Sequence, residues 1–140
     1  MNTFLLEILT PEKPFFRGEC VSVIVPTSDG MFGILANHAP LTAAISDGKI
    51  TWTQGDGTTR ICAVTRGMVS AAAGRVRVLC ESAVFPEEID EEKERLKMQE
   101  AELEMRKRRS YEEYVASQLA FAKAFNRLKV KQYSAMQTNR

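Results

Sequence analysis

The chain has 140 residues, of which 44% are hydrophobic and 26% are charged, and its formal net charge is +1. This length allows one compact domain or a small domain with an appendage, and the near-neutral charge gives no electrostatic preference for nucleic acid or for a membrane surface. The N-terminal residues lack the basic region of a signal peptide, no apolar run approaches the ~20 residues of a membrane-spanning helix, and the cysteines show no CxxC spacing. We therefore expect a cytoplasmic protein with reduced thiols that binds no nucleic acid and inserts no segment into a membrane.

Glycine and proline divide the chain into two parts. All 8 glycines and all 5 prolines lie at or before Pro86, and the residues after it contain neither. Glycine and proline separate strands at turns, whereas their absence favours continuous helix. The division predicts a β-rich domain at residues 1–86 and a helical domain at residues 87–140.

Short alternating runs in the first part predict strands. The run Cys20–Val25 places Val21, Val23 and Val25 on one face, and the run Arg75–Cys80 turns Val76, Val78 and Cys80 inward while its arginines stay in water. Gly55-Asp56-Gly57 lies between two further runs, which is a strong hairpin pattern. About eight to ten strands of this kind predict a flattened antiparallel β-sandwich or barrel.

Residues 28–41, SDGMFGILANHAPL, contain two glycines, one proline and the only histidine of the chain. Asp29-Gly30 predicts a turn, because glycine tolerates positive φ and aspartate can bond its own backbone, and Pro40 keeps His38 out of a helix. His38 has no second histidine, cysteine or acid at ligand spacing, so a structural or interface role is favoured over a metal ligand or a catalytic base. We expect no metal site and no catalytic residue.

The second part predicts an antiparallel two-helix hairpin. Pro86 and the acids after it suit the start of a first helix, and the basic run Arg106–Arg109 suits its end. Ser110-Tyr111-Glu112-Glu113 is a capping box that starts a second helix. The apolar stripe of the second helix contains Tyr114, Phe121, Phe125 and Leu128, and the poorer set of the first contains Ile89, Leu96, Met98, Ala101, Leu103 and Met105. Neither helix is stable alone, so each needs a partner surface.

Charge along the hairpin is polarised. There are nine acids and three bases from Glu87 to Glu104, and nine bases and two acids from Arg106 to Arg140. In an antiparallel pair the acidic start of the first helix faces Lys123 and Arg127 of the second. Exposed ion pairs contribute only about 0.2–1 kcal/mol each, so the predicted hairpin can open and act as a switch. Taken alone, the basic run favours a helix cap with a solvated face.

The string Gly30-x-x-Gly33-Ile34-Leu35-x-Asn37-His38-Ala39-Pro40-Leu41 closely resembles the motif of the epsilon subunit of bacterial F-type ATP synthases, the counterpart of the mitochondrial delta subunit. The segments Ala43–Gly48 and Lys123–Leu128 look like further positions of this family, and the likeness extends over essentially the whole chain. The resemblance implies a non-catalytic central-stalk (rotor) subunit that couples proton flow to ATP synthesis. It also implies a place in the ATP synthase at the cytoplasmic face of the cell membrane.

The resemblance assigns partners to particular positions. The sandwich would bind the gamma subunit near His38 and the membrane c-ring through the turn Asp29-Gly30-Met31-Phe32. The hairpin would extend to the catalytic alpha and beta subunits and restrain ATP hydrolysis. Basic side chains would dock it there, namely Arg106, Arg108, Arg109, Lys123 and Arg127.

One subgroup of the family folds the hairpin around ATP through the pattern Ile/Leu-Asp-x-x-Arg-Ala. The matching segment here is Ile89–Glu94, in which Lys93 replaces the arginine and Glu94 replaces the alanine. Lysine lacks the bidentate fork that suits phosphate, and Glu94 adds a like charge. No cofactor is required, and the resemblance implies only a weak regulatory ATP site at Asp90, Lys93, Lys123 and Arg127.

Two other classes of function compete with a rotor subunit. A stand-alone adaptor module could share the architecture, and stable co-purification with gamma would distinguish the two. A nucleotide hydrolase would need a Walker-type glycine loop, a nucleophile with its base, or a metal site, and the sequence contains none of these.

Overall fold

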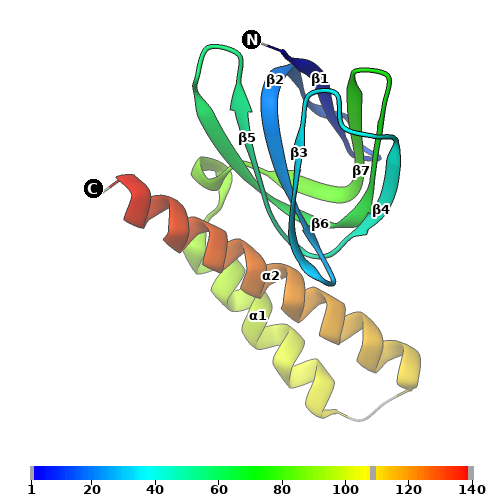
Figure 1. The fold of residues 1–140 in the computed structure, drawn as a ribbon. Coiled ribbons are helices and arrows are strands. Elements are labelled where there is room, and N and C mark those ends of the chain that lie inside the picture. The colour runs from blue at the N-terminus through cyan, green and yellow to red at the C-terminus, as the bar shows by residue number, and fades with distance from the viewer. Residues whose placement is uncertain (1, 108–109, 139–140) are drawn as a thin grey trace. The chain divides into compact units, whose positions relative to one another are not determined.

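The computed structural model describes residues 2–107 and 110–138. The chain forms two compact units, Met1–Val84 and Phe85–Arg140, each of which is described by itself. Figure 1 shows the first unit as strands and the second as a pair of helices. The predicted fold class, a β-sandwich followed by two packed helices, is confirmed.

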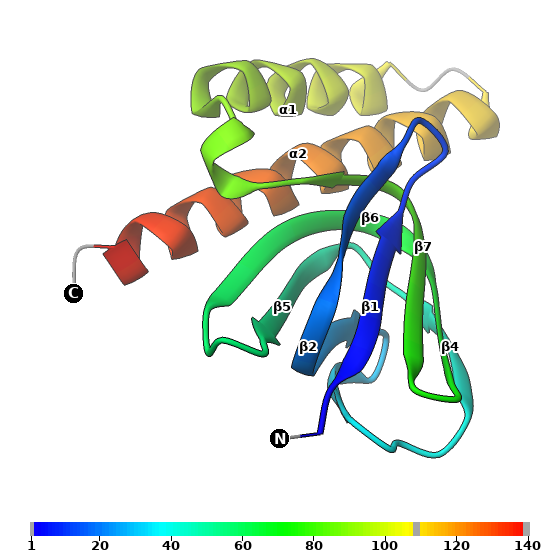
Figure 2. The ribbon, with the colours of Figure 1, turned by 90° about the horizontal axis from the view of Figure 1, so that it is seen from above.

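Seven strands form the first unit. Their bounds are β1 Phe4–Leu9, β2 Pro14–Thr27, β3 Gly30–Leu35, β4 Leu41–Ile45, β5 Gly48–Gln54, β6 Thr59–Ala72 and β7 Arg75–Val84. They hydrogen-bond in the order β1-β7-β6-β5-β2-β3, with β4 on β6 and β1 also on β2. All pairs are antiparallel except β1 with β7, which is parallel. Figure 2 shows the strands curving around a shared interior.

Two long strands explain why the described residues hold seven strands rather than the eight to ten predicted. The first half of β2 pairs with β1, and its second half pairs with β3 and β5. Likewise β6 pairs with β5 near its start and with β4 near its end. Each long strand therefore serves both layers of the sandwich, where the sequence pattern predicts separate shorter strands.

Gly67 allows β6 to run closely past β7. A Cβ atom at this position would overlap the carbonyl oxygen of Leu79 and lie 2.6 Å from the Cα of Cys80. Real Cβ contacts essentially never fall under 3.0 Å. Glycine is therefore required here for close backbone approach.

A β-bulge in β2 changes which side chains of the Cys20–Val25 run face the core. Cys20 opposes Gln54 on β5 but Ser22 opposes Thr53, so Val21 is an extra residue in the ladder. As a result Cys20 and Val23 are both fully buried, whereas Val21 is only half-buried. The strict alternation predicted for Val21, Val23 and Val25 is wrong at its first member.

The sandwich core consists of residues from both layers. Its largest fully buried side chains are Trp52, Leu6, Ile8, Ile34, Ile50, Val23, Val25, Val64, Val69 and Val78. Phe16 packs against Trp52 with ring centroids 4.8 Å apart. Within this core Thr65 and Ser82 satisfy each other through a 2.7 Å hydrogen bond between their hydroxyls. Val76, Val78 and Cys80 face inward as predicted.

The predicted β5–β6 hairpin is confirmed. Gly57 adopts φ 90°, and the carboxylate of Asp56 accepts a 2.8 Å hydrogen bond from the backbone amide of Thr58. This hydrogen bond lowers the pKa of Asp56. Aspartate and glycine thus occupy the positions at which a tight turn requires them.

The helical unit begins differently from the prediction. Pro86 opens a 3₁₀ turn, η1 Pro86–Glu88, and the α-helix α1 spans Glu91–Arg106. Asp90 is the N-cap of α1, with its Oδ1 accepting a hydrogen bond from the backbone amide of Lys93 at 3.2 Å. Aspartate can satisfy a helix amide in this way whereas proline cannot, so the helix starts five residues later than Pro86 suggests.

The second helix, α2, spans Tyr111–Thr138, and its predicted Ser110 cap is present. The hydroxyl of Ser110 accepts a 3.1 Å hydrogen bond from the backbone amide of Glu113. Of the apolar set predicted for the first helix, Leu96 and Leu103 are more than half exposed and Ala101 is buried, as is Ala124 of α2. Among the described residues, neither helix is both long enough and apolar enough to cross a membrane.

Candidate interaction surfaces

The β2–β3 turn presents two large apolar side chains to solvent. The hydroxyl of Thr27 fixes the turn by accepting from the amide of Asp29 at 3.2 Å and donating to the carbonyl of Gly30 at 2.7 Å. Gly30 adopts φ 114°, as the predicted turn requires. Directly after it, Met31 is 55% exposed and Phe32 is 39% exposed. The turn predicted to meet the c-ring is therefore an apolar protrusion whose base is held by two hydrogen bonds of Thr27.

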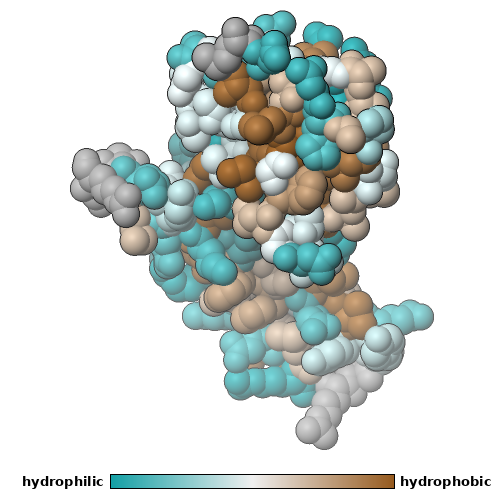
Figure 3. Space-filling view, in the orientation of Figure 1, coloured by the Kyte–Doolittle hydropathy of each residue, from teal (hydrophilic) through white to brown (hydrophobic). Residues whose placement is uncertain are grey.

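The apolar surface continues along β2 and β3. Ile24 pairs with Gly33, and Leu35 lies two residues further along the same face of β3. Ile24 is 39% exposed and Leu35 is 65% exposed. Figure 3 shows hydrophobic side chains gathered on this face of the sandwich. A contiguous exposed apolar face of this kind is typical of a protein–protein interface.

His38 lies next to Phe32, which is on the face of β3 opposite to Leu35. Its ring meets that of Phe32 edge-on with centroids 5.8 Å apart, and its Nδ1 lies 2.7 Å from the carbonyl oxygen of Ala39. Asn37, with φ 65°, turns the chain before it. The structure thus brings together the residues predicted for gamma and for the c-ring. In the part of the chain that the structure describes, no group of three or more His, Cys, Asp or Glu side chains could hold a metal ion.

A groove of about 440 Å³ runs between α1 and α2. Lys123 and Arg127 both line it, so the structure brings together two of the four residues predicted for ATP. Asp90 and Lys93 do not line it, and the carboxylate of Asp90 caps α1 instead. Three acids also line the groove, namely Glu94, Glu100 and Glu104, and with Lys97 the bases that line it are equally three. The groove therefore has no excess of positive charge that would attract a polyanionic ligand.

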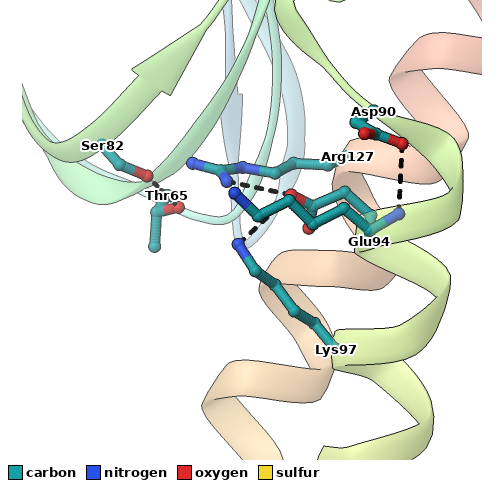
Figure 4. A network of polar contacts seen from close by, with 7 residues as sticks. Thr65, Ser82, Asp90, Glu94, Lys97 and Arg127 are labelled. Carbon is teal, nitrogen blue, oxygen red and sulfur yellow. Dashed lines mark hydrogen bonds and ion pairs between the residues drawn. The ribbon is translucent and has the colours of Figure 1, made fainter.

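Glu94 carries the main polar contacts of the groove. Its side chain is only 6% exposed, and its Oε1 lies 3.3 Å from Nη1 of Arg127 on α2 and 3.6 Å from Nζ of Lys97 on α1. Figure 4 shows Arg127 and Lys97 converging on this carboxylate. The predicted facing of acids on the first helix and bases on the second is confirmed at Glu94 and Arg127.

The basic end of α1 is partly described. Arg106 donates to Glu102 at 2.8 Å, and Lys107 donates to Glu104 at 2.8 Å, so both make intrahelical ion pairs. The Arg106 side chain is still 72% exposed. Arg108 and Arg109, also predicted to dock on the catalytic subunits, lie outside the described residues. An exposed, basic helix end is compatible with docking on an acidic surface.

Comparisons with known proteins identify the family. The model of the ATP synthase delta/epsilon chain beta-sandwich domain matches residues 3–86. An ATP synthase epsilon chain of Ruminiclostridium cellulolyticum is 40% identical over 128 residues, which cover 91% of this chain and 95% of that one. The chain belongs to the ATP synthase delta/epsilon family. It is therefore a non-catalytic subunit, as the sequence predicts.

Other members of the family and solved structures agree. The ATP synthase epsilon chain of Caldanaerobacter subterraneus is 34% identical and covers 92% of this chain and 94% of its own length. A chain in the mitochondrial ATP synthase of Euglena gracilis superposes with a TM-score of 0.78 at 17% identity, covering 97% of this chain and 82% of that one. At this identity the structural match shows a shared fold. Together they extend the likeness across both the sandwich and the hairpin.

Two groups of polar contacts in this delta/epsilon chain, one at Glu94 and one at Glu7, are not predicted from the sequence. Glu94 is predicted only as a charge that weakens ATP binding, yet it is a buried part of the helix pair. Its spacing of seven residues from buried Ala101 places both on one face of α1, and that spacing is the available signal. Glu7 on β1 gathers three arginines at 3.3–3.6 Å, namely Arg17, Arg75 and Arg77. Arg77 is 70 positions from Glu7 along the chain, a separation that no local pattern bridges.

Proposed function

We propose that this chain is the central-stalk (rotor) subunit of a proton-translocating F-type ATP synthase, peripheral at the cytoplasmic face of the cell membrane. The observation that carries the proposal is the 40% identity, over nearly the whole of both chains, to an ATP synthase epsilon chain. A chain of Tetrahymena thermophila mitochondrial ATP synthase described as central stalk/c-ring also shares the fold, with a TM-score of 0.59 at 12% identity. In this proposal the sandwich binds gamma and the c-ring, and the hairpin acts on alpha and beta.

The apolar turn and face of the sandwich support the first half of the proposal. Met31 and Phe32 protrude from the turn, and Ile24 and Leu35 extend the exposed apolar surface along β2 and β3. His38 sits against Phe32, which lies on the face of β3 opposite to Met31 and Leu35, so the residues assigned to gamma and to the c-ring meet at the turn. Burying these side chains against a partner would stabilise the complex at roughly 25 cal/mol for each Å² of apolar area.

Charge substitution of the turn tests this role. The double variant M31D/F32D should weaken the coupling of proton flow to ATP synthesis in membrane vesicles, because two carboxylates would have to be desolvated at the interface. Thr59→Asp is the matched control, since it adds a charge at an exposed position of the β5–β6 hairpin, which Figure 1 shows at the opposite end of the sandwich. Unchanged coupling in M31D/F32D would remove the turn from the interface.

The helical unit supports a restraining role. From Arg106 onward the chain carries nine bases and two acids, a balance that suits an acidic partner surface. Deleting residues 87–140 should raise ATP hydrolysis by the assembled enzyme while leaving assembly intact. Replacing the five basic docking residues Arg106, Arg108, Arg109, Lys123 and Arg127 with alanine should reproduce much of that rise. Equal hydrolysis rates for native, truncated and alanine-substituted enzymes would show that the hairpin does not restrain hydrolysis.

We propose that regulatory ATP binding is weak in this chain. Lys123 and Arg127 line the groove, but Asp90 is engaged as the α1 cap and Glu94 forms an ion pair with the guanidinium of Arg127. A nucleotide would have to displace a buried carboxylate to reach that guanidinium. The hairpin of this chain is therefore proposed to close without nucleotide.

A further inference from the structure

The interface between α1 and α2 is poor in large apolar side chains. The apolar side chains that line the groove between the helices are all alanines, Ala101, Ala116, Ala120 and Ala124, of which Ala101 and Ala124 are 5% and 1% exposed. Leu96 and Leu103 of α1 are 52% and 57% exposed. Small side chains bury little apolar area, so hydrophobic burial contributes only modestly to keeping the two helices together. Polar contacts therefore supply a larger share of the free energy that holds the two helices together.

The Glu94–Arg127 ion pair is the least exposed ion pair across this interface among the described residues. The Glu94 and Arg127 side chains are 6% and 15% exposed, in contrast with 48–72% for the Glu102–Arg106 pair within α1. A carboxylate that is buried without its cation is strongly unfavourable. Consequently the buried Glu94 carboxylate is stable in the interface only while a cationic side chain such as Arg127 faces it. When the helices separate, Glu94 and Arg127 both return to water.

We propose that Glu94 is an intramolecular substitute for an acidic partner of Arg127. In the closed hairpin the carboxylate of Glu94 holds this guanidinium, and opening of the hairpin releases it for an acidic surface of another subunit. The inference rests on the proposed function, in which Arg127 docks on the catalytic subunits. The closed and docked states then compete for one cation, so the strength of the Glu94–Arg127 pair sets how readily the hairpin opens.

This competition predicts effects of opposite sign for the two members of the pair. Glu94→Gln removes the internal competitor, so it should favour the open, docked state and lower ATP hydrolysis by the assembled enzyme. Arg127→Gln also opens the hairpin but removes a docking cation, so it should raise hydrolysis. A pair with a purely structural role would instead change hydrolysis in the same direction when either partner is lost.

Amide hydrogen exchange on the isolated full chain tests the first half of the inference. Glu94→Gln should speed exchange of the α1 and α2 amides beside Ala101 and Ala124 by about tenfold or more, because it removes a buried partner. Glu102→Gln is the matched control, since it removes an exposed ion pair of the same helix, and it should change exchange by less than about threefold. A double-mutant cycle with Arg127→Gln should show that the two effects are not additive. Additive effects, or equal exchange in E94Q and E102Q, would overturn the ion pair as the closing contact.

Hydrolysis by the assembled enzyme tests the second half. With native, E94Q, R127Q and 87–140-truncated chains, we expect E94Q below native and R127Q above it. If truncation raises hydrolysis but E94Q raises it too or leaves it unchanged, the competition is refuted while the proposed restraining role stands. If truncation changes nothing, the restraining role is wrong and the docking half of this inference is wrong with it, whereas the exchange result still decides the closing contact.

Discussion

Replacing Gly67 with alanine should severely destabilise the sandwich. The added Cβ would overlap the Leu79 carbonyl oxygen and lie 2.6 Å from the Cα of Cys80, where ordinary contacts are 3.4–4 Å. The neighbouring atoms are backbone, so β6 and β7 would have to move apart at this pair. Loss of about two ladder hydrogen bonds at 0.5–1.5 kcal/mol each, with about 1–3 kcal/mol of overpacking, gives about 2–6 kcal/mol. This is a large part of the 5–15 kcal/mol that is typical of a domain.

The single tryptophan provides a direct assay. Trp52 is fully buried in the sandwich core, so its fluorescence during thermal unfolding reports on this unit and not on the helices. For a domain of this size each kcal/mol shifts Tm by about 4–8 °C, so G67A should unfold at least about 8 °C below the native chain. Gly33→Ala is the matched control, because no atom lies within 4 Å of its added Cβ and β3 is an edge strand. If G67A and G33A unfold at the same temperature, the close approach of β6 and β7 is not essential.

Two further predictions concern ionisable groups. Burial raises the pKa of the Cys20 and Cys80 thiols from 9.0 to about 11, so their protonated forms stabilise the fold fully below pH 9, and this stabilisation is lost as pH rises through about 11. The Tm of the native chain should therefore fall more steeply between these pH values than that of C20A/C80A, and parallel curves would contradict the assignment. Calorimetry should show millimolar or no ATP binding by the native chain and binding tighter by about one to two decades in K93R/E94A. Micromolar binding by the native chain would refute the weak-site argument.

Local patterns were sufficient for the turns, the caps and the division of the chain. The glycine and proline distribution places the change from strands to helices at Pro86, and the two units divide between Val84 and Phe85. Asp29-Gly30 forms the predicted turn and Ser110 caps the second helix as predicted. A positive φ or a hydrogen bond to an amide three residues away depends only on nearby residues, so a local pattern can predict it. The family motif likewise lies within one continuous stretch of sequence.

Long-range pairing was decided only in the tertiary structure. Val21 forms a bulge at the point where β2 passes from one set of partner strands to the next. The residues next to Val21 in the sequence do not by themselves require a bulge. Glu7 meets three arginines from two other strands, an arrangement that depends on strand order and register.

The hairpin shows the same limit of sequence reasoning most clearly. Leu96 and Leu103 belong to the apolar set predicted for the first helix, but both are more than half exposed, and the buried residues of α1 are Glu94 and Ala101. The sequence alone determined that two helices of complementary charge would follow the sandwich. Which face of α1 meets α2 depended on the geometry of two helices in contact, where small side chains allow close approach and a carboxylate can be buried only opposite a cation such as Arg127.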